Sequence, residues 1–387
     1  MRMRATLGLW MVWAVVGSAA CDLDVPDFNA ADLNDLRNNP TRSAVATAVT
    51  GLLVAMRDEY DDRNGYVSLL GILGRESYNF DGADPRFITE MLEGPLDPAS
   101  PAFGANLWAE RYRNLRQGDL ILRAVDALAE GEMSAEEKEA VRGFVKTMMA
   151  HELLLVVNTR DTLGAVVAIN EDPLADPAPL VPRSEAFLTV ERWLDEGKAH
   201  LEAAGDAFPF PLTSGFAGFD TPAEFLKVNR ALRARVAVYM GSLGIGNPVT
   251  KFNEAIAALD ESFYTLSPTF ANWPQQPDLG VYHVFTTGSG DNVNELFDPG
   301  DAPDIVAHPS IFTDAELLPG ESVRSDLTVD LRYQRKIRRV QSQTQRDLTT
   351  DLAFRIYNSL SAPMPIIRNE ELILLRAEAE LGRGNVG

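Results

Sequence analysis

Long amphipathic helical segments dominate this 387-residue chain and restrict the folds open to it. In residues 105–132, apolar side chains such as Trp108, Leu115 and Leu122 recur every three or four positions. This spacing places them on one face of a helix. The next segment begins at Ser134, and a glutamate three residues later completes a capping-box pattern. Because each apolar face must be buried against another element, the two segments predict a helical hairpin.

A second helical pair follows the first. Its members begin at Ser184 and at Thr221, and the proline after Thr221 suits the first turn of a helix. Helix pairs of this size resemble tetratricopeptide units, although no sequence repeat occurs at a fixed period. We therefore predict a mainly α fold with a tetratricopeptide-like scaffold of helical hairpins. Shorter helices are predicted at residues 42–57, 251–263 and 368–382.

Two regions rich in glycine, proline and aromatic residues interrupt the helical pattern, residues 58–101 and 264–365. The second region contains an alternating stretch, residues 351–360, that predicts an edge strand. We interpret the two regions together as a loop-rich excursion from the scaffold that binds a ligand.

Aromatic residues in these regions are the candidate ligand-binding groups. Rings on loops can stack against the apolar faces of sugars or contact peptide side chains, while neighbouring amides supply hydrogen bonds. The alternative for any single ring is that it fills a small core beneath a loop. As a group, they predict a ligand-binding site that contains Tyr78, Asn79, Phe80, Trp273 and Tyr282.

The N-terminus has the pattern of a bacterial lipoprotein signal. Two arginines precede an apolar run that is short for a bilayer span, and four small residues lead to Cys21, the one cysteine of the chain. Acylation of this thiol would anchor the protein to a membrane. We therefore predict a lipoprotein signal peptide at residues 1–20, a tether at residues 21–41 and a helical domain at residues 42–387. The alternative is an ordinary signal peptide followed by a chance cysteine.

The search for catalytic or metal-binding groups is negative. His151 and Glu152 begin a zincin-like pattern, but Leu155 stands where the second histidine belongs, so we expect a helix-surface pair. The basic run at residues 332–339 predicts a solvated face. We therefore predict that the chain is not an enzyme and has no cofactor and no metal site. A formal charge of −21 also disfavours nucleic acid as a partner.

Several segments resemble, in order, the SusD/RagB family of outer-membrane nutrient-binding lipoproteins. After Cys21, the stretch "WAERYRNLRQGDLIL" at residues 108–122 is similar to the family's W-x3-Y-x2-I-x3-N helix, with leucine and aspartate at its last two places. The segment "PMPIIRNEELILLRAEAELGRGN" at residues 363–385 resembles the family's P-x-I-R-x-x-E-x-L-L-x-x-A-E-A signature. The family carries a further C-terminal segment, so the resemblance implies that the C-terminal part is missing here.

The resemblance implies a lipid-anchored protein at the cell surface of the outer membrane. Such a protein would act as a lid over a SusC-like, TonB-dependent transporter and capture oligosaccharides for nutrient uptake. A peptide ligand is the alternative within the family. Two other classes stay open: a helical scaffold for the transporter that binds no ligand, and a glycoside hydrolase with two converging carboxylates.

Overall fold

The computed structural model describes residues 33–97, 106–169, 178–266 and 278–385. The predicted signal peptide and Cys21 lie outside the described residues. Within the segment expected to be a tether, α1 (Leu33–Asn38) packs against α5 (Asn106–Ala127), and its Leu36 is 1% exposed. None of the helices in the described part of the chain is both long and apolar enough to cross a membrane.

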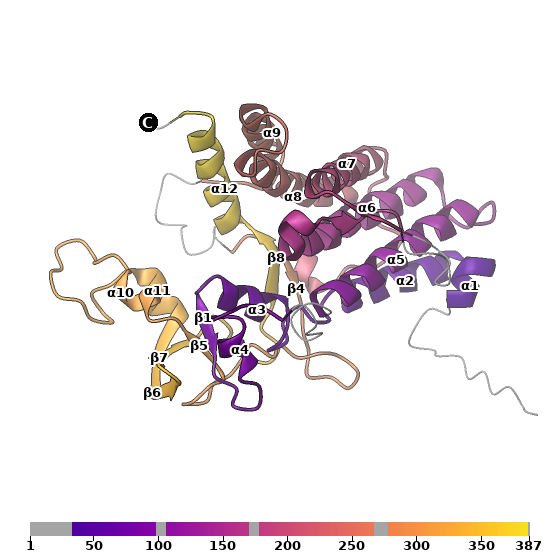
Figure 1. The fold of residues 1–387 in the computed structure, drawn as a ribbon. Helices are drawn as coiled ribbons and strands as arrows, with labels where there is room; N and C mark the ends of the chain where they lie inside the picture. Colours follow the sequence, from indigo (N-terminus) through magenta and orange to yellow (C-terminus); the bar gives the residue numbers. More distant parts are fainter. Residues whose placement is uncertain (1–32, 98–105, 170–177, 267–277, 386–387) are drawn as a thin grey trace, which may run out of the picture.

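A stack of long helices forms the scaffold, and each helix packs against the next one along the chain (Figure 1). Helix α5 packs on both α2 and α6, then α6 on α7, α7 on α8, and α8 on α9, while α12 returns to cover α8 and α9. The prediction of a mainly α scaffold of helical hairpins is therefore confirmed. The bounds are α2 (Arg42–Ala55), α5 (Asn106–Ala127), α6 (Ala135–Arg160), α7 (Arg183–Glu202), α8 (Pro222–Ser242), α9 (Pro248–Asp260) and α12 (Asn369–Gly382).

The main core lies between these helices. The Phe144 ring of α6 stands at its centre, with the Phe225 ring centroid 4.7 Å and the Phe210 ring centroid 5.2 Å away. Small residues let the helices approach closely: a Cβ at Gly143 would lie 2.6 Å from the Leu201 Cγ atom of α7. Because α6 is covered by neighbours on both sides, its buried residues run almost without interruption from Ala140 onward.

The helix starts follow local sequence in most cases. Ser134 makes the expected capping box at the start of α6, and the Thr221 side chain accepts a hydrogen bond from a backbone N–H of α8. The expectation that Ser184 caps α7 is wrong, because the N-cap of α7 is Pro182, two residues earlier. Sequence reading also missed the Asn247 cap, whose side chain accepts from the backbone of Thr250 and starts α9 earlier than expected.

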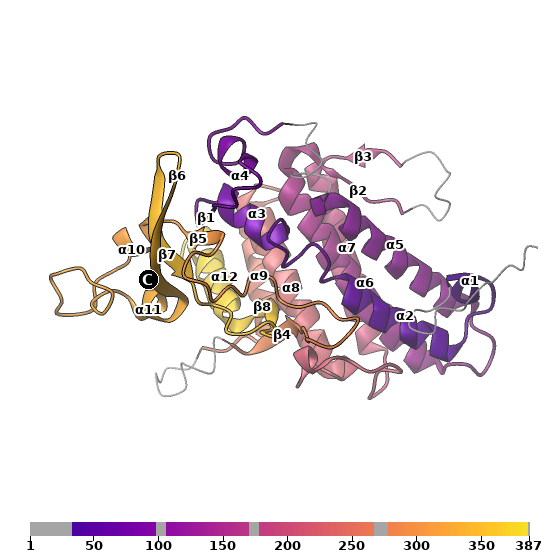
Figure 2. The same cartoon turned by 90° about the horizontal axis from the view of Figure 1, so that it is seen from below.

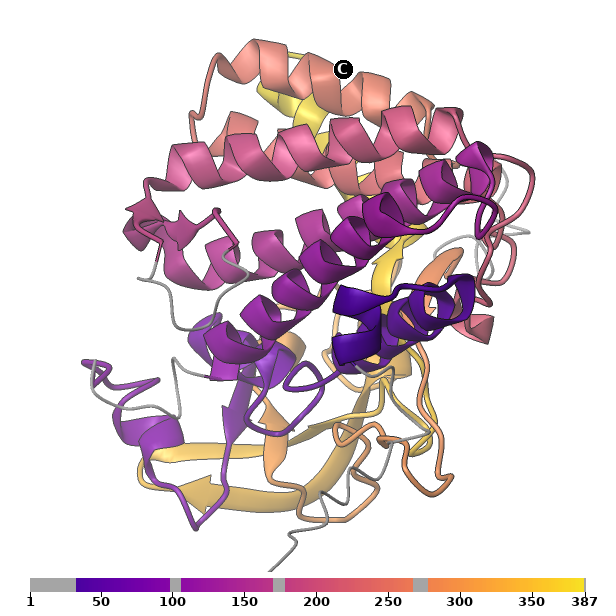
Figure 3. The same ribbon diagram turned by 90° about the vertical axis from the view of Figure 1, so that its right-hand side faces the viewer.

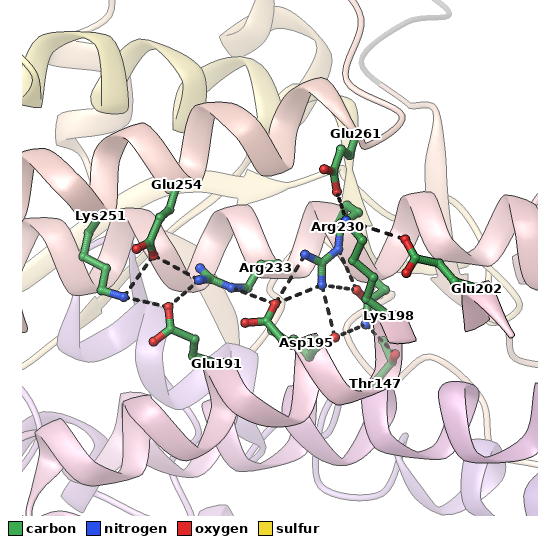
Figure 4. Close-up of polar contacts among 12 residues, drawn as sticks. Thr147, Glu191, Asp195, Lys198, Glu202, Arg230, Arg233, Lys251, Glu254 and Glu261 are labelled. Atoms are coloured by element: carbon green, nitrogen blue, oxygen red, sulfur yellow. Dashed lines mark hydrogen bonds and ion pairs between the residues drawn. The ribbon is translucent and has the colours of Figure 1, made fainter. Parts of the chain in front are cut away.

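A network of charged side chains joins α7, α8 and α9 (Figure 4). Arg233 of α8 lies between two glutamates, hydrogen-bonded to Glu191 of α7 and 3.0 Å from Glu254 of α9. Lys251 completes the group, 2.7 Å from Glu191 and 2.9 Å from Glu254. The network ties three consecutive helices in register, and a network of this kind stabilises more than isolated surface pairs do.

The irregular regions form small sheets on the other side of the molecule (Figure 2). The largest sheet consists, in spatial order, of β1 (Ser77–Asn79), β5 (Ile305–Ala307), β7 (Leu348–Phe354) and β6 (Ile337–Gln345). Neighbouring strands in it are antiparallel. The strand expected at residues 351–360 corresponds to β7, but β7 lies between β5 and β6, so the edge position is wrong. The basic run falls in α11 and β6, where Arg339 pairs with Asp326 at 2.7 Å and with Asp351 at 2.8 Å.

The excursion lies below the scaffold helices in Figure 3, and other short elements connect the scaffold helices. Strand β4 pairs with β8, which leads directly into α12. The bounds are α3 (Tyr66–Leu73), β1 (Ser77–Asn79), α4 (Arg86–Thr89), η2 (Asp161–Leu163), β2 (Ala165–Val166), β3 (Leu180–Val181), η3 (Ser214–Phe216), β4 (Gly280–His283), β5 (Ile305–Ala307), α10 (Ser310–Thr313), α11 (Leu331–Lys336), β6 (Ile337–Gln345), β7 (Leu348–Phe354) and β8 (Met364–Arg368).

Candidate ligand-binding site

Three of the expected site residues lie in or next to β1, where they are buried. Tyr78, Asn79 and Phe80 are 7%, 1% and 7% exposed. The Tyr78 ring stacks on the Phe80 ring with centroids 5.5 Å apart, and both pack with Ile88 and Val306 in a small core. The expectation that these rings stand on a loop is wrong here, because pairing with β5 makes this segment part of a sheet and the rings are buried. Contact of these residues with a ligand stays a prediction.

Tyr282 lies at a cleft. It is half-buried in β4, and its hydroxyl donates a hydrogen bond to the backbone carbonyl of Asp278. Trp273 lies outside the described residues. Two further rings of the irregular regions, Phe87 and Phe285, are buried and fill a small core. Tyr78 and Asn79 therefore lie in the four-stranded sheet, whereas Tyr282 lies in the two-stranded sheet of β4 and β8.

We call the cleft beside Tyr282 the β4 cleft, and its volume is about 410 Å³. Its apolar lining comes from Leu53 and Val54 at the end of α2 and from Phe216 of η3. Gly215 allows η3 to approach β4, because a Cβ there would collide with the backbone carbonyl of Tyr282. The lining also includes β4 and the polar loop that follows it, with Thr286, Gly288, Ser289, Gly290 and Asp291.

Arg57 holds the loop of the β4 cleft in place. Its buried guanidinium donates to the Asp291 carboxylate at 2.5 Å and to the Val284 carbonyl at 2.5 Å. Burial alone would raise the pKa of Asp291, but the hydrogen bonds from Arg57 and Thr286 outweigh it and hold that pKa below its usual value. The loop is thus tied to the residue that follows the C-cap of α2 before a ligand binds, which lowers the entropic cost of binding.

Two histidines lie buried between the scaffold and β4. Burial lowers the pKa of His283 to about 3 and that of His151 well below its usual value, so both are neutral at pH 7. Glu152 is also buried, and both of its oxygens lie 3.1 Å from Arg111 Nη1. The expectation of a helix-surface pair at His151 and Glu152 is wrong, because α6 is covered by helices on both sides.

The β4 cleft combines an aromatic ring, an apolar wall and a loop with hydroxyl and backbone amide groups. Such a lining suits a ligand that has both apolar faces and hydrogen-bonding edges. Within the four described stretches of the chain, no group of three or more His, Cys, Asp and Glu side chains is placed to hold a metal ion.

Sequence reading missed most of the cleft. The stretch "TTGSGDN" at residues 286–292 follows a strand and is rich in glycine and hydroxyl groups, which is a signal for a shaped loop. Arg57 has no such local signal, because at the end of a predicted helix it has the pattern of a solvated arginine. Its burial depends on Asp291 and Val284, more than 200 positions away in the chain.

Comparisons with known proteins give a consistent result at the level of structure. No protein-family model matches the sequence, and no match is found among curated proteins. A SusD/RagB family protein from Bacteroides thetaiotaomicron is 18% identical, with a TM-score of 0.57 over 89% of this chain and 68% of that one. A laminarin-binding SusD-like protein is 15% identical, with a TM-score of 0.63 over 88% of this chain and 80% of that one.

A further solved structure, a SusD-like carbohydrate-binding protein from Bacteroides vulgatus, is 12% identical with a TM-score of 0.59 over 89% of this chain and 72% of that one. Each likeness spans both the helical scaffold and the excursion, since it covers nearly nine-tenths of the chain. At these identities the likeness lies in the fold. The resemblance found in the sequence is confirmed at this level: the chain has the SusD/RagB fold.

Proposed function

We propose that this protein is a cell-surface lipoprotein that captures oligosaccharides and passes them to a TonB-dependent outer-membrane transporter. The observation that carries the proposal is the β4 cleft, where Tyr282 and an apolar wall face a polar loop held by Arg57. A sugar ring has apolar faces and hydroxyl edges, so it matches both halves of this lining.

Two further observations support the proposal. One solved structure with the same fold is a laminarin-binding protein. The formal charge of −21 repels polyanions, which favours neutral glycans over acidic ones. The lipoprotein pattern that ends at Cys21 supports a location at the membrane surface, where capture and transfer to a transporter require the protein to be.

The proposal predicts that Tyr282→Ala weakens oligosaccharide binding about tenfold, because loss of the ring removes a stacking contact of about 1 kcal/mol or more. Tyr282→Phe keeps the ring and is expected to bind nearly as well as the wild type. The measurement is isothermal titration calorimetry of the full chain with laminarihexaose and maltohexaose. Tyr264→Ala serves as a matched control, because Tyr264 is half-buried against the helical core and does not line the cleft.

The same titrations separate the alternatives. Equal affinity in the wild type and in Tyr282→Ala would contradict the assignment of the β4 cleft. Binding of peptides but not of glycans would favour the peptide-binding alternative, and co-purification with a transporter without any ligand binding would favour a pure scaffold. The proposal also requires that the oligosaccharide be recovered intact after prolonged incubation, since appearance of shorter products would indicate a hydrolase.

A further inference from the structure

A second cleft lies beside α3 and shares no lining residue with the β4 cleft. It is bounded by α3 and β1 on one side, and by the segment that leads into β5 and the end of β7 on the other. We call it the α3 cleft, and its volume is about 150 Å³. A protein cavity of about this volume holds a single six-membered ring. Its size therefore suits one ring and excludes a longer segment of polymer.

The walls of the α3 cleft are mostly apolar. Val67, Leu296 and Ile305 line it together with the rings of Phe354 and Tyr357. Tyr357 is half-buried, and burial raises its pKa to about 12, so its phenol is neutral. Flat rings beside aliphatic side chains form a surface on which the apolar face of another ring can pack.

Two serine hydroxyls in the same cleft have no partner. Ser68 of α3 and Ser77 of β1 both line it, and they are 4% and 3% exposed. Their Oγ atoms make no hydrogen bond among the described residues. A buried hydroxyl without a hydrogen-bond partner destabilises the folded state and is uncommon in folded proteins. Each of the two serines therefore requires an explanation.

A ligand hydroxyl would supply the missing partner. Serine Oγ moves between three staggered positions by rotation about one bond. Because neither oxygen is engaged, rotation toward a ligand breaks no hydrogen bond. Ser77 Oγ lies against Gly71, since a Cβ at position 71 would lie 3.0 Å from it, so the absence of a side chain there leaves room for the hydroxyl.

The charges around the α3 cleft select against an acidic ligand. Glu76, Glu295 and Asp298 line it. The lining arginine, Arg63, is already paired with Asp304 at 2.6 Å. A carboxylated or phosphorylated ring would therefore be repelled by three carboxylates. Arg63 would offer it little attraction, because its charge already pairs with Asp304.

We propose that the α3 cleft is a second binding site, separate from the β4 cleft, that takes one neutral, hydroxyl-bearing ring the size of a single pyranose. Phe354 and Tyr357 contact its apolar face, and Ser68 and Ser77 exchange hydrogen bonds with its hydroxyls. The β4 cleft does not share these residues, so the proposal does not depend on oligosaccharide capture there.

The test uses the full chain and three probes, the methyl glycosides of glucose, galactose and mannose, by saturation-transfer NMR and titration. We expect weak binding of at least one glycoside, reduced about five- to tenfold by Ser68→Ala and by Ser77→Ala, since each substitution removes one hydrogen bond. Tyr282→Ala is expected to leave this affinity unchanged.

Thermal unfolding provides the control for a merely structural effect. Ser68→Ala and Ser77→Ala remove unpartnered hydroxyls, so their Tm is expected to equal or exceed that of the wild type. Ser262→Ala, by contrast, removes a hydroxyl that donates to the Leu259 carbonyl at 2.7 Å, and is expected to lower the Tm without changing glycoside binding.

Three outcomes would overturn the proposal. One is that none of the three glycosides binds. Another is that the two serine substitutions leave their affinity unchanged while Tyr282→Ala abolishes it. The third is preferential binding of N-acetyltyrosinamide, which would make the α3 cleft a site for a peptide side chain. Calorimetry with hexasaccharides measures binding at the β4 cleft independently. A negative result for one cleft therefore does not contradict the proposal for the other.

Discussion

At the scale of the residue, Glu152, which the sequence predicts to lie on a helix surface, is buried and helps to hold the scaffold helices together. Glu152 of α6 lies 3.1 Å from Arg111 Nη1 of α5 and accepts a hydrogen bond from Asn114 at 2.7 Å. Arg111 also donates to the carbonyl of Met56, the C-cap residue of α2, at 3.0 Å. This buried pair links three helices of the scaffold, and burial outweighs the nearby charge of Arg111 and raises the pKa of Glu152.

Loss of Arg111 tests the importance of this pair. We expect Arg111→Ala to lower the free energy of unfolding by about 3–5 kcal/mol, because Glu152 would remain buried without its counter-charge. Urea unfolding followed by circular dichroism measures the change. Arg113→Ala is the matched control two positions along α5: Arg113 is exposed and pairs with Glu110, so we expect a change within about 0.5 kcal/mol. Similar small losses in both variants would contradict a role for the buried pair.

At the scale of the element, helix starts depend on short-range patterns, while strand positions depend on distant partners. The caps at Ser134 and Thr221 were predictable because each capping bond joins residues three positions apart. The alternation in residues 351–360 likewise indicates a strand. The position of β7 inside the sheet depends on β5 and β6, and no local pattern in β7 contains that information.

The two serines expected as caps give a direct comparison. Ser134→Ala removes the side chain that caps α6, so we expect it to lower the free energy of unfolding by about 1 kcal/mol. Ser184→Ala is expected to change it by less than about 0.5 kcal/mol, because Ser184 is the second residue of α7 and exposed. The same urea experiment measures both, and an equal loss in the two variants would show that the α7 boundary is misplaced.

At the scale of the whole molecule, the signature-like segment near the C-terminus joins scaffold and excursion. Glu371 of α12 pairs with buried Arg235 of α8 at 2.5 Å, and Arg235 also donates to the Ile366 carbonyl of β8 at 2.9 Å. The Asn369 side chain bonds the backbone of Thr265 in both directions. These contacts hold β8, and with it β4 and Tyr282, against the helices.

The proposed anchor acts on the molecule as a unit. We expect Cys21→Ala to shift the protein from the membrane fraction to the soluble fraction, because the substitution removes the thiol that would be acylated. Cell fractionation and immunoblotting in a Gram-negative host measure the shift. Ser18→Ala keeps a small residue in the signal and is expected to remain with membranes. Retention of Cys21→Ala at the membrane would contradict lipid anchoring through this residue.

Local sequence was enough to establish the helical scaffold, because apolar spacing and caps act over three or four residues and give the same pattern wherever a helix is half-buried. It was also enough to indicate an aromatic-rich excursion. Tertiary contacts decided which rings are buried: Tyr78 and Phe80 face a core because β1 pairs with β5, more than 200 positions away. They likewise decided that Tyr282, Arg57 and Asp291 meet at one cleft, since exposure of a side chain depends on what packs over it and not on its neighbours in the chain.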